Sequence, residues 1–245
     1  MEGTAVFIEL VFLLAGFIKG VIGLGLPTIS MGLLAIVMPP VEAAALLIIP
    51  SFLTNVWQMV AGPSLPAVVR RLWPMMVAVC IGTWAGAGLM TGATARYGTV
   101  VLGIALALYA LTGLTAFRFT IAKKSEPIYG PLSGGITGLI TAATGVFVIP
   151  AVPYLQAIGL DKEQLVQALG LSFTVSTVAL AFNVTRAGAF NLSIAGATIG
   201  ALATASIGMW LGTALRQKLQ PAAFLRWFFI GLLLLGIYLT VRSLV

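Results

Sequence analysis

Apolar runs follow one another along almost the whole chain, and they constrain the fold more than any other feature of the sequence. They fall roughly at residues 5–38, 42–60, 72–90, 97–119, 129–160, 164–185, 191–214 and 222–244. Runs of about 18 or more apolar residues are typical of helices that cross a bilayer, whereas a transmembrane β-barrel would show short segments of alternating polarity. The sequence therefore predicts an all-α, multi-pass membrane protein embedded in a lipid bilayer.

The scarcity of charged and reactive side chains excludes several classes of function. Only 8% of the 245 residues are charged, where a soluble domain averages about 25%. The chain has no histidine and a single cysteine, Cys80, so we expect no metal site, no catalytic site and no cofactor, and hence no enzyme. The net charge of +7 comes from scattered basic residues, which is typical of membrane-protein loops and does not require a nucleic-acid partner.

Two of the runs, 5–38 and 129–160, are too long for one crossing. As straight helices they would measure about 50 Å, against a hydrocarbon core of about 30 Å. The first is interrupted by GVIGLGLP, and the second by TAATG with IPAVP following. We therefore predict that each long run forms two shorter helices that meet at a break.

The two long runs also begin two similar halves of the chain. GFIKGVIGLG (16–25) matches GGITGLITAA (134–143), and PPVEAAALLIIPSF (39–52) matches LDKEQLVQALGLSF (160–173). The sequence therefore predicts one membrane domain of two repeats, residues 1–120 and 121–245, each with a broken helix and three transmembrane helices.

The distribution of basic residues favours long runs that fold back as re-entrant hairpins. Single crossings would divide the loop charges seven against five between the two sides. Hairpins leave only Arg96, Arg186 and Arg242 on one side, which fits the positive-inside rule better. The second repeat then starts from the opposite face, so the halves become inverted repeats, as in many secondary transporters. The cytoplasmic side would carry Arg70, Arg71, Arg118, Lys123, Lys124, Lys162, Arg216, Lys218 and Arg226.

The two breaks are candidate binding sites for an anion. A half-helix that starts inside the membrane presents unpaired N–H groups and a partial positive charge. Pro27 suits the first turn of such a helix because it has no N–H to lose, and we expect the two breaks to meet near the bilayer midplane. The residues that contribute to the breaks are Gly23, Gly25, Pro27, Thr28, Thr141, Thr144 and Gly145.

Lys19 lies in the first long run with no acid within one helical turn. An ionisable group inside a span costs roughly 3 kcal/mol on insertion scales and suggests a functional site. Beside a helix N-terminus, Lys19 would complete a cationic pocket. Two alternatives are that it snorkels to the headgroups or that it pairs with Glu9, which is also the main acid candidate for proton coupling.

Further polar residues inside the predicted spans support either packing or binding. For Thr54 and Thr177 we favour interhelical hydrogen bonds. Two stretches, 51–58 and 171–178, place polar residues four apart on one face, where they could pack helices or bind substrate. These candidates are Ser51, Asn55, Ser172 and Ser176.

Glycines at four-residue spacing predict close helix packing rather than a binding site. They are Gly16, Gly20, Gly82, Gly86, Gly134, Gly138, Gly196, Gly200, Gly208 and Gly212.

The starts of the two halves, GFIKGVIGLG and GGITGLITAATG, each followed by a proline and an acidic helix start, resemble the TauE/SafE sulfite exporter family. The resemblance extends over nearly the whole chain in length, number of spans and paired halves. It implies transport of a sulfur-containing anion such as sulfite, thiosulfate or an organosulfonate. The sequence departs from the usual pattern at Lys19, where a small or apolar residue is expected.

Residues and resemblance together predict a secondary transporter that moves a small sulfur-containing anion across a bacterial or archaeal plasma membrane by alternating access. Neutral donors from Ser, Thr and Asn would take the oxygens of the anion. Two alternatives are an anion channel, whose flux would not saturate, and a membrane subunit of a larger complex. No nucleotide-binding loop occurs, so ATP drive within this chain is not expected. The sequence leaves the oligomeric state open.

Overall fold

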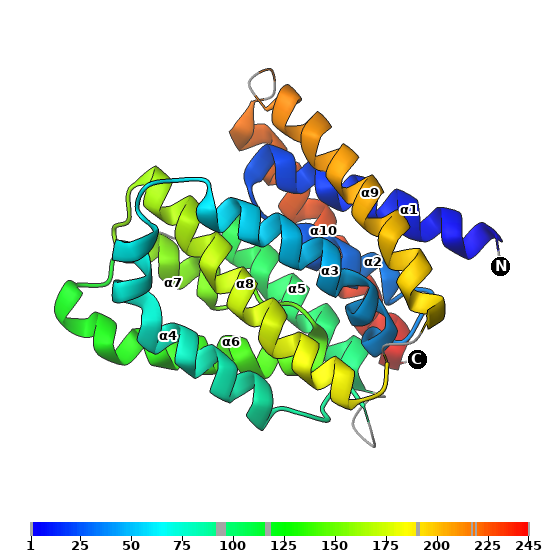
Figure 1. The fold of residues 1–245 in the computed structure, drawn as a ribbon, viewed down its shortest axis with the longest axis horizontal. Helices are drawn as coiled ribbons and strands as arrows, with labels where there is room; N and C mark the ends of the chain where they lie inside the picture. Colours follow the sequence, from blue (N-terminus) through cyan, green and yellow to red (C-terminus); the bar gives the residue numbers. More distant parts are fainter. Residues whose placement is uncertain are drawn as a thin grey trace.

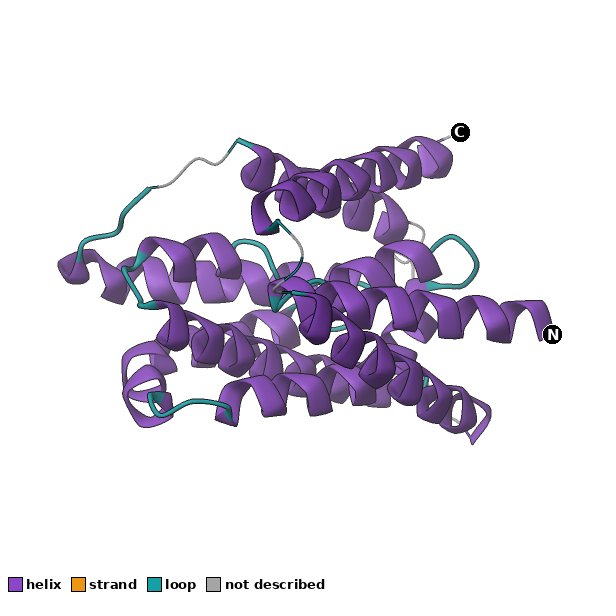
Figure 2. Cartoon of the chain, turned by 90° about the horizontal axis from the view of Figure 1, so that it is seen from above, coloured by secondary structure: helices purple, strands orange, loops and turns teal. Residues whose placement is uncertain are grey.

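The structure, a computed structural model, describes residues 2–91, 97–115, 119–189, 192–216, 218 and 220–244, and every regular element within them is helical. The first half contains α1 (Glu2–Ile22), α2 (Leu26–Leu34), α3 (Pro40–Val60), α4 (Leu65–Ala85) and α5 (Gly98–Leu114). The second contains the 3₁₀ turn η2 (Lys123–Ser125), α6 (Glu126–Thr144), α7 (Ala151–Ala157), α8 (Lys162–Arg186), α9 (Leu192–Leu215) and α10 (Pro221–Leu244). The predicted all-α fold is confirmed (Figures 1 and 2).

Six of the described helices, α1, α3, α4, α8, α9 and α10, are long and apolar enough to cross a bilayer, and α5 is apolar but shorter. Large apolar side chains on their outer faces are exposed, for example Ile81 at 61% and Ile199 at 71%. Lipid tails can cover such side chains without cost, whereas water cannot. The chain is therefore a multi-pass membrane protein.

Both long apolar runs are broken and fold back, as predicted. α1 ends at Ile22, and α2 begins at Leu26 and turns back toward the start of α3 (Figure 1). In the second half, the Ile121 N–H donates to the Ala157 carbonyl at 2.9 Å, so the two ends of that run lie together. The long runs are hairpins and not single crossings.

Helices of the two halves pack in a pattern that stays the same when the halves are exchanged. α1 packs along α9 and α6 along α4, while α3 packs against α8 and α5 against α10. The α4–α6 pair is parallel, since Gly134 lies beside Met75 and Gly138 beside Val79. α3 and α8 run in opposite directions across the centre of the molecule (Figure 1). These four pairs of packed helices therefore correspond to one another when the halves are exchanged.

Glycines permit the closest of these contacts. A Cβ atom on Gly134 or Gly138 would overlap backbone atoms of α4, and a Cβ on Gly16 or Gly212 would overlap backbone atoms across the α1–α9 contact. Close packing through small residues, as the sequence predicts, is therefore confirmed for both helix pairs. Gly196 differs, because nothing lies within 4 Å of its Cβ position.

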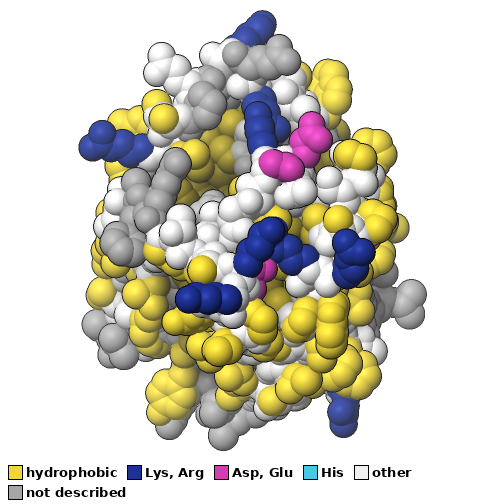
Figure 3. Space-filling view, turned by 90° about the vertical axis from the view of Figure 1, so that its left-hand side faces the viewer, with side chains coloured by type: hydrophobic (Ala, Val, Ile, Leu, Met, Phe, Trp, Pro, Cys, Tyr) yellow, Lys and Arg dark blue, Asp and Glu magenta, His cyan; other side chains and the backbone are white. Residues whose placement is uncertain are grey.

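Basic side chains gather at one end of the helix bundle (Figure 3). Arg186 and Arg242 lie at the C-terminal ends of α8 and α10, at the opposite end. Arg96 and Arg118 lie outside the described residues. This is the end that the positive-inside rule predicts to face the cytoplasm. The residues at or near helix ends there are Arg70, Arg71, Lys123, Lys124, Lys162, Arg216, Lys218 and Arg226.

Candidate functional site

Lys19 lies in the last turn of α1 and, among the residues whose burial the structure describes, is the only charged side chain that is buried, at 4% exposure. Its Nζ atom donates to Thr54 Oγ1 at 3.0 Å and to Asn55 Oδ1, both on α3. The snorkelling alternative is wrong because the side chain does not reach the surface. Pairing with Glu9 is also wrong, since Glu9 is exposed and no ion pair joins the two described residues. Its exposure also removes Glu9 as a buried proton carrier.

The charge of Lys19 is not balanced inside the protein. An ammonium group has three N–H donors, and the described residues provide acceptors for two of them. Both acceptors are neutral, and no described carboxylate lies within ion-pair distance. A buried charge without a counter-charge is costly. With Lys19 protonated, the site is therefore short of one negative charge and of one hydrogen-bond acceptor among the described residues.

A directed chain of hydrogen bonds connects Lys19 to the second half of the protein. Asn55 Oδ1 accepts from the ammonium, and Asn55 Nδ2 donates to Ser51 Oγ at 3.0 Å. Ser51 Oγ lies 3.4 Å from Thr177 Oγ1, whose hydrogen is donated to the Phe173 carbonyl. Ser51 is therefore the donor to Thr177. The interhelical hydrogen bonds predicted for Thr54 and Thr177 are confirmed. This series of hydrogen bonds crosses the contact between α3 and α8.

The first break lies one turn beyond Lys19. Gly23 donates its N–H to the Lys19 carbonyl at 2.7 Å, and both Gly23 and Gly25 have positive φ, at 78° and 113°. Such backbone favours glycine because it has no Cβ. Pro27 lies in the first turn of α2, as predicted, and Thr28 Oγ1 donates to the Gly25 carbonyl at 3.1 Å. α1 therefore ends and α2 begins directly beside the lysine.

The second break has a different local chemistry. Gly145 closes α6 with a φ of 71°. The Thr141 and Thr144 hydroxyls donate to carbonyls of their own helix, Thr137 and Ile140, each at 2.7 Å. These hydroxyl hydrogens are already committed, so the two threonines hold the helix end in place.

The two breaks do not meet at one level, so that part of the prediction is wrong. A Cβ on Gly23 would lie 4.0 Å from Gln58 Nε2, near the C-terminal end of α3. The second break lies near the start of α3, since the Cβ position of Gly98 is 3.7 Å from both Ala143 O and Pro40 Cγ. α2 links the two regions, because Met31 packs on Gly145.

Buried hydroxyl groups that find no hydrogen-bond partner among the described residues lie on α6 and α8, which pack together, and one more, Ser30, lies on α2. On α8 they are Ser172 and Ser176, both fully buried. On α6 they are Ser133 and Thr137, which lie one turn apart. The sequence interpretation missed these two residues, although the match between the repeats places Thr137 opposite Lys19. Most other buried threonines donate to their own helix, so these four hydroxyls are available to a ligand or water.

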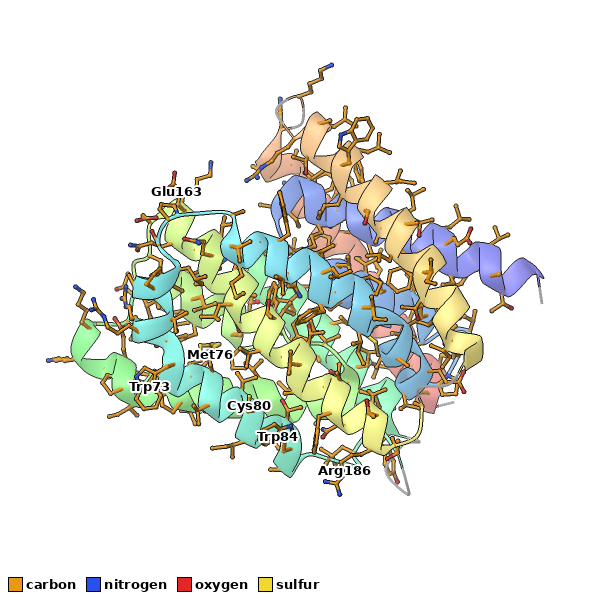
Figure 4. All side chains as sticks on the ribbon, in the orientation of Figure 1. Trp73, Met76, Cys80, Trp84, Glu163 and Arg186 are labelled. Atoms are coloured by element: carbon orange, nitrogen blue, oxygen red, sulfur yellow. The ribbon has the colours of Figure 1, made fainter. Side chains whose placement is uncertain are left out.

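A cavity of about 240 Å³ opens at the basic end, away from Lys19. It lies between the starts of α4 and α8, whose far ends Figure 4 marks with Trp84 and Arg186. On its wall, Arg71 is bound to Glu126 at 2.7 and 2.9 Å. The sequence interpretation did not include this cavity, which is lined by Ala67, Val68, Arg70, Arg71, Leu160 and Gln164.

The structure thus shows a multi-pass membrane protein with paired halves, two hairpins and a buried lysine beside a helix break. The chain belongs to the family described as Sulfite exporter TauE/SafE, which it matches over residues 8–239. Membership places it among transporters of sulfite and related sulfur anions. No curated protein and no solved structure matches the chain.

Proposed function

We propose that this protein is a secondary transporter that moves a small sulfur-containing anion, such as sulfite, thiosulfate or an organosulfonate, across a bacterial or archaeal plasma membrane. One observation carries the proposal: the buried ammonium of Lys19 is held only by neutral oxygens. The family accounts for the class of cargo. An anion beside Lys19 would supply the missing charge and the missing acceptor.

The proposed site combines charged and neutral donors. The anion would accept the third N–H of Lys19, while the N-terminus of α2, shaped by Gly25 and Pro27, adds a partial positive charge nearby. The unpartnered hydroxyls of Ser172 and Ser176 would donate to the remaining oxygens. Thr28, Thr141, Thr144 and Gly145 would shape the two breaks, and Ser51 and Asn55 would orient the lysine.

Transport would proceed by alternating access of two inverted repeats. Lys19 is closed to both sides here, at 4% exposure. Each half has a broken helix that packs along the fourth helix of the other half, α1 along α9 and α6 along α4. A conformation open to either side would follow if these two pairs moved relative to the central α3–α8 pair.

The test is flux in proteoliposomes of the purified protein. Efflux of preloaded radiolabelled sulfite should saturate with concentration and should be inhibited by an excess of unlabelled sulfite. Flux that rises linearly without saturation would favour a channel. Absence of protein-dependent flux for sulfite, thiosulfate and methanesulfonate alike would contradict the proposal.

A further inference from the structure

The charge inside the candidate site can be counted, because a single buried side chain supplies it. Among the residues whose burial the structure describes, Lys19 is the only charged residue that is buried. Its hydrogen-bond partners, Thr54 and Asn55, are neutral, and so are Ser51 and Thr177 farther along the chain of hydrogen bonds. Arg70 and Arg71 lie on the separate cavity at the basic end.

Helix ends change this count little. Lys19 lies in the last turn of α1, whose C-terminus carries a partial negative charge, and α2 begins beside it with a partial positive charge. The two partial charges are of similar size and opposite sign. With Lys19 protonated, the site therefore has a net charge close to one positive unit.

The second half does not add a second cation. The repeat match pairs Lys19 with Thr137, whose fully buried hydroxyl has no partner. The α8 hydroxyls that face no acceptor, Ser172 and Ser176, are neutral as well. At the positions that the repeat match pairs with Lys19 and its neighbours, the described residues of the second half therefore supply hydroxyls and no ammonium group.

From this count we infer that the site selects anions with one negative charge, namely hydrogensulfite and organic monosulfonates, over dianions such as sulfate, thiosulfate and disulfonates. The inference rests on the proposed function and narrows its substrate. A monoanion beside Lys19 leaves the buried region neutral, whereas a dianion leaves one negative charge uncompensated, and an uncompensated buried charge is strongly unfavourable. Hydroxyl donors reduce this penalty but do not remove it.

The test compares methanesulfonate with sulfate, two tetrahedral anions of similar size that differ in charge. Binding to the purified full-length protein is measured by calorimetry at one pH and constant ionic strength. We expect methanesulfonate to bind at least about tenfold more tightly than sulfate. Ethanesulfonate and ethane-1,2-disulfonate should differ in the same direction.

Two variants separate charge from shape. Lys19→Arg keeps one charge in a different shape and should keep the native preference for methanesulfonate, whereas Lys19→Ala removes the charge and should lose binding of both anions. Equal or tighter binding of sulfate by the native protein would overturn the charge inference while leaving the proposed transporter intact. Binding of none of these anions, nor of sulfite, would contradict the proposed function itself. If Lys19→Arg does not fold, the comparison of the two anions on the native protein still decides.

Discussion

Replacing Asn55 with aspartate should fill the anion site from within. Asn55 Oδ1 accepts a hydrogen bond from Lys19, and Asn55→Asp changes the charge with almost no change in shape. The new carboxylate would be the counter-charge that Lys19 lacks. Two unit charges about 4 Å apart at an effective dielectric constant of about 20 attract by about 4 kcal/mol. A substrate anion would lose most of that attraction, which is about a thousandfold in affinity.

The assay is calorimetric binding of sulfite and methanesulfonate to purified Asn55→Asp, together with its melting temperature in detergent. Affinity should fall below detection, and the melting temperature should stay equal or rise because a buried charge has gained a partner. Asn183→Asp is the matched control: Asn183 lies near the far end of α8 and donates to the Thr83 carbonyl at 2.7 Å. That variant should melt at a lower temperature but still bind anions.

Native-like anion binding by Asn55→Asp would refute the reasoning, since it would mean that the charge of Lys19 does not attract the substrate. A large drop in melting temperature would also count against it. Such a drop would mean that Lys19 already has a negatively charged neighbour, whereas its hydrogen-bond partners, Thr54 and Asn55, are both neutral.

Two further predictions concern the fold. Gly138→Leu should abolish folding, because even a Cβ atom at this position would overlap the backbone of α4. The loss of folding would be seen as loss of monodisperse protein in detergent. Gly135→Ala is the control and should be tolerated, because no described atom lies within 4 Å of that Cβ position. In a cysteine-free background, single cysteines at Lys124 and Lys162 should react with a membrane-impermeant thiol reagent from one side and a cysteine at Arg186 from the other. Labelling of the first two from opposite sides would contradict the hairpin of α6 and α7.

The helix breaks and the all-α membrane fold could be predicted from the sequence, because both depend on residues that are close together along the chain. Apolar runs fix the spans. Gly23 and Gly25 weaken a helix because glycine loses more backbone entropy than other residues, and Pro27 lacks the N–H that would continue it. The glycine spacing likewise predicts close helix packing, which the structure shows for α4 with α6 and for α1 with α9. Each of these features depends on residues that are neighbours along the chain.

The surroundings of Lys19 were less predictable, because its partners are distant in sequence. Thr54 and Asn55 lie 35 and 36 residues farther along the chain, and a polar stripe on a helix does not reveal what faces it. The level of the breaks was also misjudged. α1 already runs 21 residues before its break, about 30 Å at 1.5 Å per residue, so the break lies near the far end of the crossing.

The role of Lys19 is tested most directly by anion binding to the native protein, Lys19→Ala and Lys19→Arg, measured side by side with sulfite and methanesulfonate. We expect saturable binding by the native protein, loss of binding in Lys19→Ala, and partial binding in Lys19→Arg, which keeps the positive charge in a different shape. Unchanged binding in Lys19→Ala, with the protein folded, would contradict the claim that this buried ammonium holds the substrate.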